Sequence, residues 1–188
     1  MSTPGLDRVV PETVTATKPG PFSQLDLTAF PDGDTAVYPG QGPCRLGRVV
    51  KKLVDGRVIL FYHLTLLGNK GGELFVPVDK AGNLGIRPLM KRSEIPQVMS
   101  HLKKKAKPAE TWKQRNADNL RLLYSGSPYD LAEVVASLSH LRYTKALSLS
   151  EARTLDKARK LLVLEISEAS GITEVTTEEQ VDYALNSE

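Results

Sequence analysis

Short runs of alternating apolar and polar residues fill the chain between residues 32 and 90, a pattern typical of antiparallel β-structure. Runs at 34–38, 48–53, 58–67 and 74–78 predict strands, with turn-forming sequences between them. Asp55-Gly56 favours a tight hairpin, because both central positions of a type I′ turn need a positive φ angle. Pro77 cannot donate to a ladder, so it indicates an edge strand or a strand end. This part of the chain therefore predicts a small, curled sheet or barrel.

From residue 93 onward, the apolar spacing becomes that of amphipathic helices. Thr111 with Gln114 fits a capping box for a helix over 112–124 that stops at Gly126. Ser127 caps the next helix, and Pro128 lies in its first turn, where a missing N–H costs nothing. The apolar stripe of this helix consists of Leu131, Val134, Val135, Leu138 and Leu141.

Two more helix starts follow. Ser148 with Glu151 forms a second capping box, and the helix that it starts should end near Gly171. Thr176 with Glu179 predicts the start of a short last helix.

The order of strands followed by helices predicts an α+β protein or two separate domains. Residues 1–28 mix Pro, Thr, Gly and single charges without periodicity, so we expect a mobile arm there. We then expect a β domain over 29–92 and a compact all-helical domain over 93–188.

The charges are unevenly distributed, although the net charge is only +3. Residues 91–126 carry nine Lys or Arg against three Asp or Glu, whereas residues 127–188 carry six against eleven. A polyanionic partner for the middle segment is one interpretation. A solvated basic face is the other, and charge alone favours it.

The only tryptophan, Trp112, lies in this basic segment. At 100° per residue, it falls at the border of the apolar stripe formed by Leu120, Leu123 and Tyr124, with Arg115 on its outer side. A tryptophan there could stack on or wedge against a base while cations hold phosphates. Alternatively it plugs the joint between two helices, and the residues alone favour this reading. The cations around it are Lys103, Lys104, Lys105, Lys107, Lys113, Arg115 and Arg121.

A second basic patch is predicted on the helix that starts at Ser148. Arg153, Lys157 and Lys160 follow an i, i+4, i+7 spacing and share a face, with Arg159 off it. A solvated face is again the alternative. The patch supports DNA binding only where it lies beside Trp112 in space.

The chain lacks the usual sequence signs of catalysis. We find no phosphate-binding glycine loop, dinucleotide fingerprint or nucleophile elbow, and the three histidines have no partners at a spacing typical of a site. A single cysteine, Cys44, allows no disulfide and fits a reducing cytosol. No metal site, cofactor, signal peptide or membrane span is predicted. We therefore expect a cytoplasmic protein that is not an enzyme.

Across residues 32–170, the sequence resembles the CarD/CdnL family, whose first domain is shared with transcription-repair coupling factors. No single motif is decisive, but the set taken in order is specific. The matching stretches are Gly33–Gly42, Phe75–Val78, Leu84–Arg87, Trp112–Arg115 with Asn119-Leu120, Leu131–Val135 with Leu138, and Ser150-Glu151 through Leu155, Lys157–Arg159 and Leu162.

The resemblance implies a Tudor-like five-stranded first domain that docks on the RNA polymerase β subunit. It also implies a helical domain on promoter DNA, with Trp112 wedged at the upstream edge of the melted region. We therefore expect a nucleoid-associated monomer that stabilises or tunes open promoters. The expected DNA-binding residues are Trp112, Lys113, Arg115, Arg153, Lys157 and Arg159. The expected polymerase-binding residues are Lys52, His63, Thr65 and Phe75.

The chain departs from the family pattern at three positions. Lys52 and Phe75 replace two arginines that contact polymerase, and Ala117 replaces a lysine that contributes to DNA binding. An alternative therefore stays open, in which the chain is a DNA-binding adaptor whose β domain recruits a different regulatory protein.

Overall fold

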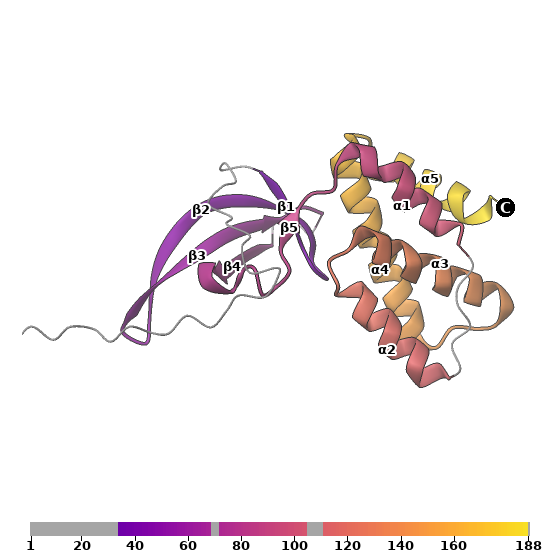
Figure 1. Cartoon of the computed structure of the whole chain (residues 1–188), viewed down its shortest axis with the longest axis horizontal. Helices are drawn as coiled ribbons and strands as arrows, with labels where there is room; N and C mark the ends of the chain where they lie inside the picture. The colour runs from indigo at the N-terminus through magenta and orange to yellow at the C-terminus, as the bar shows by residue number, and fades with distance from the viewer. Residues whose placement is uncertain (1–33, 69–71, 105–110, 188) are drawn as a thin grey trace, which may run out of the picture.

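The computed structural model describes residues 34–68, 72–104 and 111–187. The first part is one five-stranded sheet in the order β4-β3-β2-β1-β5, and every neighbouring pair is antiparallel. Figure 1 shows this sheet at one end of an elongated molecule and the helices at the other. The strands are β1 (Thr35–Tyr38), β2 (Gly42–Val54), β3 (Arg57–Leu66), β4 (Glu73–Pro77) and β5 (Arg87–Pro88).

Both local features predicted for the strands are confirmed. The β2–β3 turn has φ angles of 49° at Asp55 and 75° at Gly56, as a type I′ turn requires. Pro77 is the last residue of β4, which is an edge strand, so its missing N–H leaves no ladder position empty. The predicted arm at 1–28 lies outside the described residues.

One face of the sheet carries its hydrophobic core. A shift in register between Leu46 and Val49 bends β2, and beyond it the β2–β3 hairpin extends away from the helices (Figure 1). Side chains on the core face before the bend are buried, whereas Leu53 and Val58 near the tip are exposed. The buried set is Ala36, Cys44, Leu46, Tyr62, Leu64, Leu66, Val76, Ala81 and Ile86.

After the sheet strand β4, the described residues form two short 3-10 turns, at Val78–Lys80 and Arg92–Glu94, and then five α-helices. They are α1 (Ile95–Leu102), α2 (Trp112–Leu123), α3 (Pro128–Thr144), α4 (Leu149–Ser170) and α5 (Glu174–Asn186). A sheet followed by helices confirms the α+β fold class. Leu131, Val134, Val135 and Leu138 of the predicted α3 stripe are buried, and Leu141 packs against the same core.

The helix starts are correct at three of four predicted caps, with one detail wrong. Ser148 and Glu151 form the full capping box of α4. Thr111 accepts from the Gln114 amide at 3.2 Å, but the Gln114 side chain does not reach back. It donates instead to Asp118, one turn further along α2, where an ionised acceptor makes the stronger hydrogen bond.

The predicted start of the last helix is wrong by three residues. Thr173 caps α5, because its hydroxyl accepts from the Thr176 amide at 3.2 Å. Gly171 ends α4 at a φ angle of 73°, so only a short connection separates the two helices. Thr176 fits the capping-box spacing, with Glu179 three residues later, whereas Thr173 has Thr176 at that position, so the pattern indicated the wrong threonine.

A polar seam joins β5 to α4. The Arg87 guanidinium donates to both carboxylate oxygens of Glu165, at 2.6 and 2.9 Å, and also to the Gly126 carbonyl oxygen. Glu165 has 0% of its surface exposed and also accepts from the Met90 amide at 3.4 Å. An ion pair whose carboxylate is fully buried therefore joins the sheet to the helices. The division into units 29–92 and 93–188 stays a prediction.

Candidate nucleic-acid interface

Trp112 is the first residue of α2, and its side chain lies over the start of α4. Its indole N–H donates to the Ser148 hydroxyl at 3.4 Å, yet 49% of the residue is exposed. A tryptophan that only filled a helix joint would be largely buried. The half-exposed ring therefore favours the border position expected from the helical spacing and leaves aromatic surface free for a ligand.

Arg115, three residues after Trp112 on α2, forms an ion pair with Glu151 inside the protein. Its Nε and Nη2 atoms donate to Glu151 Oε1 at 2.9 and 2.7 Å, and both side chains are largely buried. Glu151 Oε2 accepts from the Ser148 amide and hydroxyl at 2.9 and 2.8 Å. A role for Arg115 in binding phosphate stays a prediction, and it would require this pair to open. In the structure, Arg115 fixes α2 to α4.

The pKa of Glu151 reflects two opposing effects, burial of the carboxylate and its interactions with Ser148 and Arg115. Burial raises the pKa, but the hydrogen bonds from Ser148 and Arg115, together with the Arg115 charge, outweigh burial and lower it below the usual value of 4.5. Because the folded-state pKa is lowered, this carboxylate stabilises the fold above the unfolded-state pKa. That stability is lost as pH falls through the folded-state value.

We predict that Glu151→Gln lowers the free energy of unfolding by about 2 kcal/mol at pH 7, because it leaves Arg115 with a weaker acceptor. The loss should shrink below about pH 4.5, where the wild-type carboxyl also takes up a proton. Urea unfolding of both proteins at several pH values measures this. A difference that stays constant down to pH 3 would contradict the proposed role of the charge.

Two of the cations predicted on α4 face the groove between α4 and α2. Arg153 and Lys157 line a groove of about 390 Å³ between α2 and α4. The Lys157 ammonium donates to the Tyr124 hydroxyl at 3.1 Å and lies 4.8 Å from the centre of the Tyr124 ring. Asn116, between Trp112 and Tyr124 on α2, accepts from the Ser150 hydroxyl of α4 at 3.1 Å. The basic patch of α4 supports DNA binding only where it lies beside the helix of Trp112, and Arg153 and Lys157 meet this requirement.

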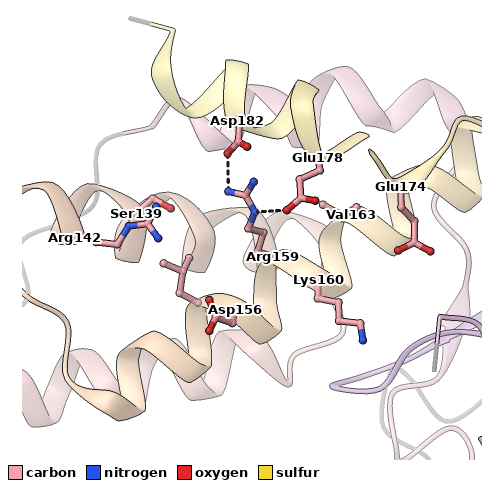
Figure 2. Close-up of a pocket in the computed structure, with 10 residues that line it drawn as sticks. Ser139, Arg142, Asp156, Arg159, Lys160, Val163, Glu174, Glu178 and Asp182 are labelled. Carbon is pink, nitrogen blue, oxygen red and sulfur yellow. Dashed lines mark hydrogen bonds and ion pairs between the residues drawn. The ribbon is translucent and has the colours of Figure 1, made fainter. Parts of the chain in front are cut away.

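Arg159 and Lys160 face elsewhere, into a pocket between α3, α4 and α5 (Figure 2). Arg159 bonds to Glu178 at 3.3 Å and to Asp182 at 2.7 Å, and the hydrogen bond to Asp182 is the main cause of its raised pKa. Arg159 thus clamps α5 onto α4, and its role in DNA binding stays a prediction. Lys160, expected to share the face of Arg153, lines this pocket instead.

The four residues expected to bind polymerase lie on the sheet face opposite the core, and three of them are in contact. The Lys52 ammonium is 3.1 Å from the centre of the Phe75 ring, and the His63 ring stacks on Phe75 at 5.0 Å. Thr65 is adjacent, paired with Glu73 across β3 and β4. They form one surface on three strands, in which Lys52 and His63 lie against the Phe75 ring and Glu73 lies 3.5 Å from His63. Whether it binds polymerase stays a prediction.

The sequence patterns did not reveal the partners of these side chains. Only the capping box at Ser148 gave a local signal, because it placed Glu151 at the start of α4. Nothing near Arg87 or Glu165 in sequence indicated a buried pair. Tyr124, expected on the apolar stripe, is 52% exposed and packs against the Gly40 turn of the sheet.

The described residues provide little for other chemistries. Within 34–68, 72–104 and 111–187, no three His, Cys, Asp or Glu residues are grouped to hold a metal, and none of the helices there is long and apolar enough to span a membrane. Burial raises the pKa of Cys44 to about 11, which keeps this thiol protonated and unreactive at neutral pH.

Comparison with known proteins matches both parts of the chain. The CarD-like/TRCF RID domain model matches residues 30–90, and the model of the CarD C-terminal domain matches residues 97–182. The protein described as "Putative transcription factor YdeB" of Bacillus subtilis (strain 168) is 28% identical over 149 residues. That alignment covers 77% of this chain and 95% of the Bacillus protein. The matches therefore include the sheet, the helices and the seam residues between them.

Proposed function

The chain belongs to the CarD/CdnL family of transcription regulators that interact with RNA polymerase, and from this premise we propose how its two parts act. The sheet docks on the polymerase β subunit through the surface around Lys52, His63, Thr65 and Phe75. The helical part contacts promoter DNA and stabilises or tunes the open complex. The protein acts as a monomer at the nucleoid and catalyses no reaction.

The half-exposed Trp112 is the observation that carries this proposal. Its ring is held at the start of α2 by Ser148 without being covered, so apolar aromatic surface is already in place before DNA arrives. A wedge of this kind fits between bases only where they are unstacked. It therefore binds melted DNA better than duplex, and this difference in affinity sets how far the open complex is favoured.

Cations around Trp112 supply the sequence-independent part of the affinity. Lys113 is exposed next to the wedge, and Arg153 and Lys157 lie in the neighbouring groove. Each can hold a backbone phosphate, and their contribution weakens as salt rises, because bound phosphates release counterions. Arg115 and Arg159 act indirectly in this proposal, since they hold α2 and α5 against α4.

We predict that Trp112→Ala shortens the lifetime of open promoter complexes about ten-fold while leaving polymerase binding unchanged. The reason is that the substitution removes only the aromatic surface offered to unstacked bases. The measurement is the decay of preformed polymerase–promoter complexes after addition of a competitor, with and without the protein.

Tyr183→Ala is the matched control, because Tyr183 is an exposed aromatic residue on α5 that lines a hollow with Met99 and Lys103 of α1 and does not line the α2–α4 groove. It should leave the lifetime unchanged. An unchanged lifetime with Trp112→Ala would exclude the wedge. Failure of the wild-type chain to bind core polymerase would instead favour the adaptor alternative, with the sheet binding another regulatory protein.

A further inference from the structure

We propose that the groove between α2 and α4 is a binding site for a few nucleotides of single-stranded DNA. This inference rests on the proposed function, which requires Trp112 to meet melted DNA, and it adds a path for the strand beyond Trp112. The groove is lined by Leu120, Leu123, Tyr124, Leu149, Ser150, Arg153, Thr154 and Lys157.

The groove begins beside the contact between Trp112 and Ser148, because the next two residues, Leu149 and Ser150, line it. Trp112, Asn116 and Leu120 of α2 and its C-cap residue Tyr124 are spaced four residues apart and form one ridge along the helix. α4 runs beside this ridge, since Ser148 contacts Trp112, Ser150 contacts Asn116 and Lys157 contacts Tyr124. At 1.5 Å per residue, the ridge is about 18 Å long, or roughly five steps of a nucleic-acid strand at 3.4 Å each.

Large apolar side chains are exposed at both ends of this path and at two positions between them. Leu149 is 68% exposed, and Trp112, Tyr124 and Leu120 are also exposed. A contiguous exposed patch of large apolar side chains is uncommon on a soluble protein and indicates a binding surface. Two aromatic rings at the ends, with leucines between them, resemble the stacking platforms on which proteins hold unpaired bases.

The charge of the groove selects a polyanion. Arg153 and Lys157 contribute two cations, and none of the described residues that line the groove is acidic. The nearest buried carboxylate, Glu151, is neutralised by Arg115. In contrast, the pocket between α3, α4 and α5 is lined by four carboxylates as well as cations (Figure 2). The electrostatics of the α2–α4 groove therefore suit a phosphate backbone better than those of the pocket between α3, α4 and α5.

The combination of exposed apolar side chains and cations in the groove favours a single strand over a duplex. In a duplex the bases are stacked and paired, so phosphates could reach Arg153 and Lys157 but bases could not cover Leu149 or Leu120. A strand that has left the duplex at Trp112 can satisfy both kinds of surface. Lys157 helps by holding the Tyr124 hydroxyl, which fixes the ring at the far end.

Fluorescence anisotropy with the full chain tests this site. The probes are a labelled 12-nucleotide thymidine oligomer, a duplex, and the same duplex with a central mismatched bubble. We expect the oligomer and the bubble to bind at least five-fold more tightly than the duplex. Arg153→Gln and Leu149→Ser should each weaken oligomer binding about five-fold, and Arg153→Gln should reduce the salt slope by about 0.7, the value for one phosphate contact on a single strand.

Arg142→Gln is the matched control, because Arg142 is an exposed cation on α3 that lines the other pocket. It should leave binding of all three probes unchanged. Equal affinity for duplex and oligomer, or binding unaffected by both groove substitutions, would overturn the site. A normal effect of Trp112 on open-complex lifetime beside such a result would leave the proposed function standing and reject the groove alone. Loss of the Trp112 effect together with retained oligomer binding would reject the proposed function instead.

Discussion

Arg87→Ala is expected to lower the free energy of unfolding by about 3–5 kcal/mol, the largest effect of any substitution considered for this chain. Glu165 is completely buried, and Arg87 supplies two of its hydrogen bonds and, among the described residues, the one cation paired with it. Removal of the guanidinium leaves a buried carboxylate without a countercharge, held only by the long hydrogen bond of 3.4 Å from the Met90 amide among the described residues. The Gly126 carbonyl oxygen also loses its donor.

Urea unfolding of the intact chain measures this effect, and two further variants separate its causes. Arg87→Lys keeps the charge but loses the planar fork, so it should recover only part of the stability. A double variant, Arg87→Met with Glu165→Leu, removes both charges and should recover most of it. A loss below about 1 kcal/mol in Arg87→Ala would mean that the fold tolerates Glu165 without its cation, and that the seam is not an essential ion pair.

Gly40→Ala is expected to cost about 2–3 kcal/mol, because two penalties coincide at this turn. Gly40 has a φ angle of 72°, where a side chain is strained, and an added Cβ would lie 2.3 Å from Cε1 of Tyr124. The ring would have to move away from the sheet. Since Tyr124 also bonds to Lys157, the far end of the groove would be disturbed with it.

Gly56→Ala is the matched control, because Gly56 has a φ angle of 75° but nothing within 4 Å of the position of a Cβ. It carries the backbone strain without the clash. Thermal or urea unfolding of both variants should therefore show Gly40→Ala to be the more destabilised by about 1–2 kcal/mol. In a Tyr124→Ala background this excess should disappear. An equal loss of unfolding free energy in Gly40→Ala and Gly56→Ala would show that the Tyr124 ring moves away from the added Cβ without a measurable loss of stability.

Local features of the fold could be predicted because their causes lie within a few residues. The Asp55-Gly56 turn depends on two residues that tolerate positive φ angles, and the start of α4 depends on Ser148 and Glu151 alone. The wrong start of α5 has the same origin. Thr173 and Thr176 offer similar local chemistry, and the choice between them depends on where α4 ends.

The partners of the charged residues could not be predicted, because they are far apart in sequence. Arg115 meets Glu151 over 36 residues, and Arg87 meets Glu165 over 78. Helical spacing predicts the face of the helix on which a Lys or Arg lies, but not which residue of another element it contacts. For this reason Arg115, Arg153, Lys157 and Arg159 were all candidates for DNA binding in the sequence, whereas the structure divides them into two residues of internal ion pairs and two residues of an open groove.

The buried seam between β5 and α4 also has a consequence for binding two partners at once. A protein that holds polymerase with one part and DNA with the other gains from an effective concentration, which depends on the stiffness of the connection. Here the connection is an ion pair and a packed turn, not a flexible linker. With the sheet docked as proposed, Trp112 would be presented to a small volume of the promoter. A variant with a weakened seam would lower the effective concentration of Trp112 at the promoter without altering the surface that binds polymerase or the surface that binds DNA.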